Sequence, residues 1–287
     1  MTNFRGVLNN PDPLNKVLFA LRDIGRTVSI FFSSHETTIY SLEKAGVRAV
    51  AKFHPQELFS SFQLIDCPGG VLAVEASCQD LLVVLQSSLH SRRSCTIQLQ
   101  WQGHQLLMHF TIQKDSLVSA NGAERLRTVT HSVPVYFWDA ERCLAFASSL
   151  PEPYPEISFE REDLAVMKQT IDKLARLDRY VELSLRESGC LYLASRNHHV
   201  MVQVIFNIKN QAYAEDIPQH QEYSLTLDAR DLQRVFSSTY VNPHKLVFEL
   251  QGDMAVITAV VEDEFLTRSS QLERLRYFLP VASPDAQ

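Results

Sequence analysis

The sequence has no long apolar run. The longest apolar run extends only from Leu81 to Leu85, whereas a membrane-spanning helix needs roughly 20 apolar residues. The first residues, Met1–Pro13, also lack the apolar core of a secretory signal. We therefore expect neither a membrane span nor secretion.

The sequence also lacks a cysteine pattern that would indicate disulfides or a metal site. The five cysteines are odd in number and widely spaced, and none forms a Cys-x-x-Cys motif. This pattern favours reduced, mostly buried thiols in a cytosolic or nuclear protein. The formal net charge of −6 argues against a simple basic DNA-binding domain.

Catalytic and cofactor motifs are absent too. The sequence has neither of the glycine-rich phosphate-binding signatures nor a nucleophile elbow, and it contains only nine glycines. His198 and His199 are adjacent, so on a strand they point to opposite faces and do not chelate one metal. The acidic residues 262–264 are contiguous in the sequence, which is typical of a solvated loop. Cys143 has no identifiable catalytic partner. We expect no catalytic residue, no cofactor and no metal.

The two halves of the chain resemble each other. Six short matches occur in the same order, at offsets that fall from 153 to 146 residues. A repeat of this length indicates a duplicated structural unit. The matched stretches are 26–30 with 179–183, 39–40 with 191–192, 77–81 with 228–232, 87–88 with 237–238, 102–103 with 251–252, and 133–135 with 279–281.

Each half is expected to contain two helices and a larger number of strands. Apolar residues recur at helical spacing from Leu14 to Ile24, directly after the helix-start signal Asp12-Pro13. Alternating segments flank tight turns at Gly103 and Gly252. The pattern predicts an α+β fold with antiparallel sheets. The predicted helical regions are 12–26, 77–93, 161–179 and 228–245.

A proline-rich segment separates the two halves. Pro151, Pro153 and Pro155 cannot continue a helix or a central strand. We therefore predict a first domain over 1–136, a connector over 137–158 and a second domain over 159–287.

The positive charges concentrate in the predicted helices. These four regions hold 13 of the 27 basic residues but only 9 of the 33 acidic ones. Basic helix faces suit the phosphate backbone, which dominates sequence-independent DNA binding; a solvated helix face gives the same pattern. The candidate DNA-facing residues are Lys16, Arg22, Arg26, Arg92, Arg93, Lys168, Lys173, Arg176, Arg179, Arg230, Arg234 and Lys245.

Several stretches of the chain resemble one family, nearly from end to end. Arg127–Val135 is similar to the motif that closes the first domain of the Hus-one-type subunit of the nine-one-one checkpoint clamp, a PCNA-like sliding clamp. The segment 262–273 looks longer than the family pattern. The other similar stretches are Asn3–Arg5, Leu58–Phe62, Val241–Lys245 and Leu275–Pro280.

The resemblance implies a duplicated PCNA-like fold and a nuclear role without catalysis. Three two-domain chains of this family close a ring whose helices line the hole and whose sheets cover the outside. The ring is a heterotrimer with Rad-nine-type and Rad-one-type subunits. A clamp loader places it around double-stranded DNA at damage sites, where it supports checkpoint signalling in the cell cycle and DNA repair.

The same resemblance assigns interfaces. Two strands become sheet edges that pair with neighbouring subunits, as exposed edges tend to do. The aromatic residues in and beside the connector become anchors for client proteins, although core packing explains them equally well. The expected subunit-interface residues are Arg127, Val129, His131, Val133, Val200, Val202, Val204 and Phe206, and the expected client-binding residues are Tyr136, Phe137, Trp138 and Phe146.

Three other functions compete with the checkpoint clamp. A homotrimeric replication clamp of the PCNA type differs from it by self-assembly. A DNA exonuclease on a clamp scaffold requires converging carboxylates, which the sequence does not offer. An α+β scaffold unrelated to DNA predicts that Arg230 and Arg234 affect no DNA-dependent process.

Overall fold

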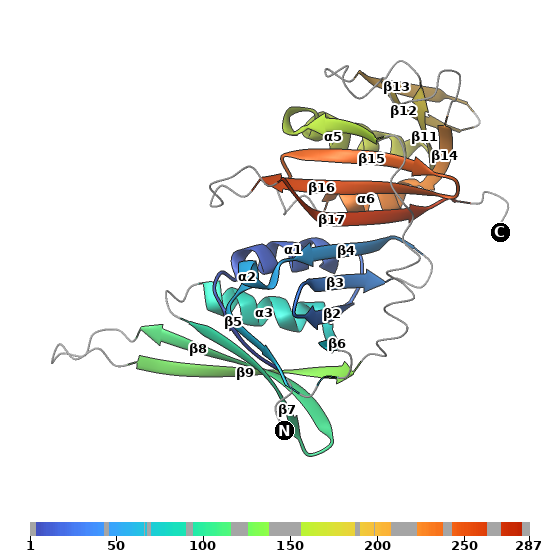
Figure 1. The fold of residues 1–287 in the computed structure, drawn as a ribbon. Helices are drawn as coiled ribbons and strands as arrows, with labels where there is room; N and C mark the ends of the chain where they lie inside the picture. Colours follow the sequence, from blue (N-terminus) through green and yellow to red (C-terminus); the bar gives the residue numbers. More distant parts are fainter. Residues whose placement is uncertain are drawn as a thin grey trace. The chain divides into compact units, whose positions relative to one another are not determined.

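The computed structural model shows two compact units (Figure 1). Unit 1 comprises Met1–Ser41 and Val50–Leu150, and unit 2 comprises Leu42–Ala49 and Pro151–Gln287. The residues that the structure describes are 4–42, 46–65, 67, 70–89, 94–115, 126–137, 156–186, 190–197, 199–207, 223–237, 243–262 and 271–282.

Unit 1 is a long sheet with its helices on one side. The strand order is β4-β3-β2-β6-β9-β8-β7-β1-β5, and every neighbouring pair from β3 to β5 is antiparallel. Its elements are β1 (Phe4–Leu8), α1 (Asp12–Arg22), β2 (Thr27–Ser33), β3 (Thr37–Leu42), β4 (Arg48–Phe53), α2 (Pro55–Leu58), β5 (Phe59–Leu64), β6 (Val71–Ser77), α3 (Cys78–Leu89), β7 (Cys95–Gln102), β8 (Gln105–Asp115) and β9 (Leu126–Phe137).

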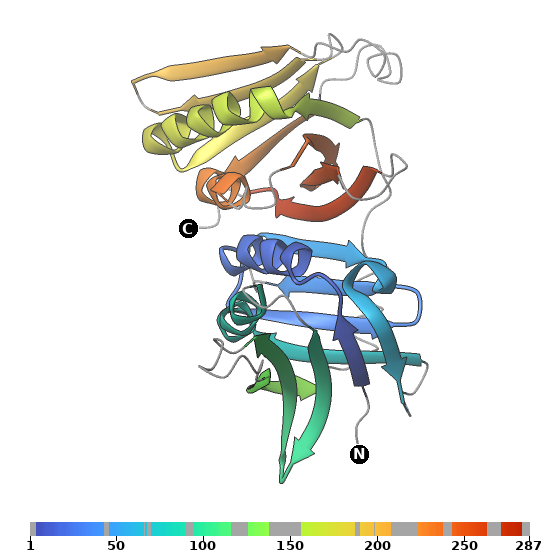
Figure 2. The same cartoon turned by 90° about the vertical axis from the view of Figure 1, so that its left-hand side faces the viewer.

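The core of unit 1 lies between the sheet and the pair α1 and α3, which run side by side (Figure 2). The predicted apolar stripe of α1 is buried, including Val17, Leu18 and Leu21. Aromatic rings fill the sheet side, where the Phe4 and Phe32 rings stack at 4.3 Å. Burying large apolar side chains in this way is the main stabilising contribution to the unit.

Unit 2 repeats this plan with two four-stranded sheets. Their orders are β13-β12-β11-β14 and β10-β15-β16-β17, and all neighbours are antiparallel. Helices α5 and α6 pack against each other and contact strands of these sheets. The elements are β10 (Glu156–Glu160), α5 (Arg161–Leu177), β11 (Tyr180–Arg186), β12 (Cys190–Arg196), β13 (Met201–Asn207), β14 (Tyr223–Asp228), α6 (Ala229–Ser237), β15 (Lys245–Gln251), β16 (Met254–Glu262) and β17 (Gln271–Pro280).

The duplication predicted from the sequence is visible in the strand orders. The run β4-β3-β2-β6 of unit 1 corresponds to β13-β12-β11-β14 of unit 2, and β9-β8-β7-β1 corresponds to β17-β16-β15-β10. In unit 1 the two runs join through β6 and β9 into one sheet. The predicted α+β fold with helices on antiparallel sheets is therefore correct.

The two predicted tight turns are also present. Gly103 has φ 63° and Gly252 has φ 38°. Positive φ is strained for residues with a Cβ, which explains glycine at both positions. Each glycine opens a two-residue connection, between β7 and β8 and between β15 and β16.

The helices are shorter than the sequence predicts. The prediction of helix up to residue 26 is wrong, because α1 ends at Arg22 and the Ile24 N–H donates to the Leu21 carbonyl three residues earlier, which tightens the last turn. The prediction up to residue 179 is wrong by two residues, because Asp178 has extended backbone angles. Helix α3 ends at Leu89, and the candidate DNA-facing residues Arg92 and Arg93 lie outside the described residues.

The largest correction concerns the last predicted helix. Helix α6 ends at Ser237, and Lys245 opens strand β15, opposite Glu160 of β10. Pro243 gives the physical reason, since a residue without an N–H cannot continue a helix. Lys245 is therefore not on a helix face, contrary to the prediction.

The expected connector overlaps two strands. Strand β9 includes Phe137, and β10 begins at Glu156. Residues 138–155 lie outside the described part of the chain. Within the described part, no helix is long and apolar enough to cross a bilayer.

Candidate nucleic-acid interface and assembly edges

The candidate DNA-facing residues of unit 1 lie on and just after α1. Lys16 is exposed and forms an ion pair with Asp12, one turn earlier, at 2.7 Å. Arg22 lies 3.5 Å from Asp23 and stacks over the Phe19 ring at 5.2 Å. Exposed ion pairs of this kind contribute little to stability, so these cations remain available to a charged partner.

Arg26 completes the unit 1 set. It lies between α1 and β2 with its side chain exposed. Because α1 ends before it, Arg26 extends the basic surface from the helix end rather than from a helix face.

In unit 2, the candidate residues of α5 lie away from its buried stripe. Leu164, Met167 and Ile171 are buried, whereas Lys173 is exposed and Lys168 is half-buried. This division matches the amphipathic pattern read from the sequence. The basic side chains of α5 therefore reach solvent beside a helix whose opposite face forms the core.

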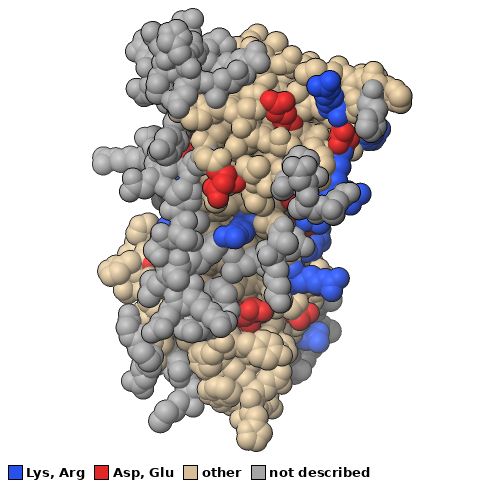
Figure 3. Space-filling view, turned by 90° about the vertical axis from the view of Figure 1, so that its right-hand side faces the viewer, with Lys and Arg blue, Asp and Glu red and all other residues tan. Residues whose placement is uncertain are grey.

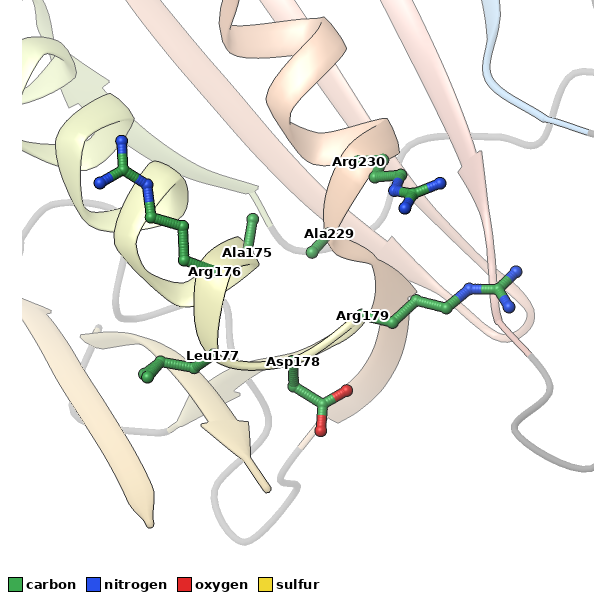
Figure 4. Close-up of a pocket in the computed structure, with 7 residues that line it drawn as sticks. All are labelled: Ala175, Arg176, Leu177, Asp178, Arg179, Ala229 and Arg230. Carbon is green, nitrogen blue, oxygen red and sulfur yellow. The ribbon is translucent and has the colours of Figure 1, made fainter. Parts of the chain in front are cut away.

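Three arginines line one pocket where α5 ends and α6 begins. The pocket has a volume of about 430 Å³ and includes Arg176, Arg179 and Arg230. Ala175 and Ala229 also line it, and these small side chains leave the space open. In Figure 4, Arg179 and Arg230 extend to the same side, and Arg176 extends to the other. The sequence prediction named all three arginines but not the pocket that they line together.

Acidic groups balance part of this charge. The Arg179 Nε donates a hydrogen bond to Asp228 Oδ2 at 3.1 Å, and this bond raises the pKa of the Arg179 guanidinium above its usual value. The other oxygen of Asp228 accepts the backbone N–H of Arg230 at 2.9 Å, as a helix cap does. In α6, Arg234 lies 3.3 Å from Asp231. Arg176 and Arg230 therefore carry the charge most available to a phosphate.

The distribution of charge over the surface agrees with this balance. Figure 3 shows Lys and Arg side chains at the surface with Asp and Glu interspersed among them. Contacts from such a surface to phosphates are sequence-independent and sensitive to salt.

The second feature of interest is a free sheet edge in unit 2. Strand β13 pairs with β12 on one side and has no described strand on the other. Its burial alternates between exposed and half-buried. An edge of this kind presents unpaired backbone groups to another chain.

A second free edge lies in unit 1. Strand β9 pairs with β8 along Leu126–Val135, but β6 covers only Val135–Phe137. The part 126–134 therefore has a described neighbour on one side only. Pro134 is compatible with such a position, because proline is confined to strand edges, strand starts and bulges.

The expected interface side chains of each strand alternate along it and so share one face, but they differ in burial. On β9, Val133 is 2% exposed and belongs to the core, so only its backbone can face a neighbour. Val129 and His131 are half-buried, and Arg127 is exposed. On β13 the half-buried face carries Val202, Val204 and Phe206, and Val200 is exposed just before the strand.

The sequence prediction missed the outer face of β13. Met201 and Ile205 are 59% and 51% exposed. They alternate with the half-buried valines, and alternation along a strand is the signal that would have identified them. Exposed apolar side chains on a free edge indicate a surface that another protein covers.

The expected client-binding aromatics are partly described. Tyr136 is 69% exposed and Phe137 is 46% exposed at the end of β9. The Phe137 ring lies 5.7 Å from that of Trp101, which is also exposed and was not predicted. Trp138 and Phe146 lie outside the described residues.

Two of the described thiols, Cys78 and Cys95, have the properties of structural residues. Burial raises the pKa of Cys78 to about 12 and that of Cys95 to about 11. Both side chains are therefore protonated at neutral pH, and a protonated thiol is a poor nucleophile and metal ligand. The described residues contain no cluster of three metal-binding side chains, and Cys143 lies outside them.

Comparison with solved structures identifies the fold. The chain is similar to the proliferating cellular nuclear antigen of Entamoeba histolytica, with a TM-score of 0.67, 9% sequence identity, and coverage of 99% of this chain and 100% of that one. At this identity the similarity shows the fold alone, which is PCNA-like.

Comparison with sequences identifies the family. No curated protein matches the chain. A family model described as "Hus1-like protein" matches residues 2–283. Because that match covers nearly the whole chain, the chain belongs to the Hus1-like protein family.

Proposed function

We propose that this chain is a non-catalytic subunit of a heterotrimeric ring that encircles DNA at damage sites in the nucleus and recruits checkpoint-signalling and repair proteins. Family membership and the PCNA-like fold support a clamp. The partners are two other clamp-like subunits, of the Rad-nine and Rad-one types, and a clamp loader places the ring.

The observation that carries the proposal is the pair of free sheet edges. Among the described strands, β9 of unit 1 is uncovered on one side over residues 126–134, and β13 of unit 2 is uncovered on one side along its length. Chains with one such edge on each of two duplicated units can join edge to edge into a closed ring. Strand pairing then satisfies backbone groups that are otherwise left to solvent.

The basic residues fit a topological way of holding DNA. Several of them are paired with neighbouring carboxylates, such as Lys16 with Asp12 and Arg179 with Asp228. Their contacts to phosphates are accordingly weak and lose strength with salt. Retention by enclosure needs no tight contact and lets the ring move along the duplex.

The aromatic residues Trp101, Tyr136 and Phe137 form the described part of the proposed client surface. Exposed aromatic side chains are frequent anchors of protein–protein interfaces. We include Trp138 and Phe146 in this proposal because they follow in the sequence.

Retention on closed DNA tests the proposal. The complex purified through the tagged full-length chain is loaded in extract of its own cells onto circular DNA and washed with high salt. We expect the chain to remain on the circle and to be released when a restriction enzyme linearises it. Equal retention on circular and linear DNA, or none on either, would contradict encirclement.

A further inference from the structure

A cluster of cationic and hydrogen-bonding side chains spans the free part of β9, the adjoining strand β8 and helix α3. Lys114 Nζ donates to Ser87 Oγ at 2.9 Å, and His131 Nε2 lies 3.3 Å from the same oxygen. Lys114 stands directly opposite Arg127 in the β8–β9 register. We call Ser87, Lys114, Arg127 and His131 the Ser87 cluster.

The cluster has no acidic partner within the described part of the chain. No described carboxylate lies within ion-pair distance of Lys114 or Arg127. Like charges directly opposite each other destabilise a strand pair. Within the described part of the chain, two like charges therefore stand at one register position, and an added negative charge would neutralise them.

The position of the cluster indicates which kind of molecule supplies that charge. It lies where β9 has a described neighbour on one side only, near the half-buried Val129 and the buried Val133. A protein chain that adds to this edge gains backbone hydrogen bonds, apolar contact and neutralisation together. A DNA phosphate would gain only the neutralisation of charge.

We propose that the Ser87 cluster binds a carboxylate side chain of a neighbouring clamp-like subunit that docks on the free edge of β9. This inference rests on the ring assembly proposed above and adds the chemistry of one neighbour. Lys114 and Arg127 pair with the carboxylate, while Ser87 and His131 hold the Lys114 side chain in place.

That neighbour differs from a second copy of this chain in the edge it presents. The chain's own free edge in unit 2, Met201–Asn207, contains no charged residue. Its exposed side chains include Met201 and Ile205. A second copy that added β13 to β9 would place uncharged residues against the like-charge pair. The two edges of one chain therefore select different neighbours, one acidic and one apolar.

Zero-length crosslinking identifies the neighbour directly. A carbodiimide joins the Lys114 amine to a carboxylate that contacts it, and mass spectrometry of the purified complex names the crosslinked chain. We expect an amide between Lys114 and an Asp or Glu of a different clamp-like subunit. The variant Lys114→Arg keeps the charge but loses the amine, so it should assemble normally and lose the crosslink.

Charge reversal measures what the contact contributes. We expect Lys114→Glu and Arg127→Glu to weaken capture of one neighbour by about tenfold or more, and to leave the other neighbour bound. Arg5→Glu is the matched control, because Arg5 is exposed on a strand that is paired on both sides. Circular dichroism of each variant checks that the chain still folds.

Each other outcome has a definite meaning. A crosslink to a second copy of this chain would overturn the proposal that the Ser87 cluster binds an acidic neighbour. Charge-reversal variants that behave like Arg5→Glu would overturn it as well. If the charge-reversal variants assemble normally but bind DNA more weakly, the cluster binds phosphate, and the proposed contact with a neighbour's carboxylate is overturned. A wild-type chain that captures no clamp-like subunit contradicts the ring itself, which separates that failure from failure of this inference.

Discussion

Lys114 and Arg127 lie directly opposite each other across the β8–β9 pair, so two cations face one another in the same register. Replacing one of them with a carboxylate turns this repulsion into a cross-strand ion pair. We expect Arg127→Glu to stabilise the isolated chain by up to about 1 kcal/mol, measured by chemical denaturation. Arg5→Glu has no cation opposite it and should be close to neutral. An Arg127→Glu chain less stable than the Arg5→Glu chain would contradict the repulsion.

In unit 2, an ion pair with a buried carboxylate contributes to stability. Glu249 on β15 has a side chain only 3% exposed, and its Oε1 lies 3.6 Å from Nη2 of Arg276 on β17. The Arg276 Nε also donates to Thr258 Oγ1 at 3.3 Å. We expect Arg276→Met to lower the free energy of unfolding by about 1–3 kcal/mol, because it removes a cation from a buried carboxylate.

The double variant Glu249→Gln, Arg276→Met tests the cause. Removing the buried charge as well should restore part of the lost stability, as measured by urea unfolding. Losses that simply add would show that the two side chains do not interact.

The buried thiols predict a dependence on pH. The folded-state pKa values of Cys78 and Cys95 are raised from 9.0 to about 12 and about 11. In the unfolded chain these thiols ionise near pH 9, while the native thiols stay protonated. The unfolded state therefore holds fewer protons above pH 9, and the stability contributed by both groups falls from there upward.

Alkylation measures the same property at single residues. In the native protein at pH 8, we expect iodoacetamide to label the half-buried Cys67 and Cys190 well before Cys78 and Cys95. Peptide mass spectrometry with and without urea separates the sites. Equal rates at Cys67, Cys190, Cys78 and Cys95 in the native protein would contradict the buried environment of the last two.

The arginine pocket predicts a change in salt dependence. Arg179 pairs with Asp228, whereas Arg176 and Arg230 line the pocket with no carboxylate partner among the described residues. Replacing both with alanine should weaken DNA binding by the purified complex. It should also reduce the slope of log K against log salt by roughly 1 for each phosphate that is no longer neutralised. The same measurement on Arg5→Ala should give the wild-type slope. An unchanged slope in the double variant would exclude the pocket from the DNA interface.

The repeat and the local signals predicted the main features of the fold. Pro13, the apolar stripe of α1 and the turn glycines Gly103 and Gly252 depend only on nearby sequence, and the structure contains each. The four helices were predicted for the same reason, but Arg26, Arg179 and Lys245 lie beyond the helix ends, contrary to the prediction. The end of α6 was predictable as well, because Pro243 precludes helix through Lys245.

The site itself depends on pairing between distant strands. Whether Val133 faces the core or a neighbour is decided by the register of β9 on β8, which a single strand does not reveal. Lys114 was not predicted for the same reason, since its position opposite Arg127 follows from that register. That Arg176 and Arg230 line one pocket follows from the packing of α5 against α6, which local sequence does not reveal.

The composition of the native assembly tests the central claim most directly. The complex is recovered through the tagged full-length chain in gentle salt from its own cells, and its subunits are counted by native mass spectrometry. We predict one copy of this 32.7 kDa chain together with two different clamp-like chains. Three copies of the chain would indicate a homotrimeric clamp, and a lone monomer would contradict ring assembly altogether.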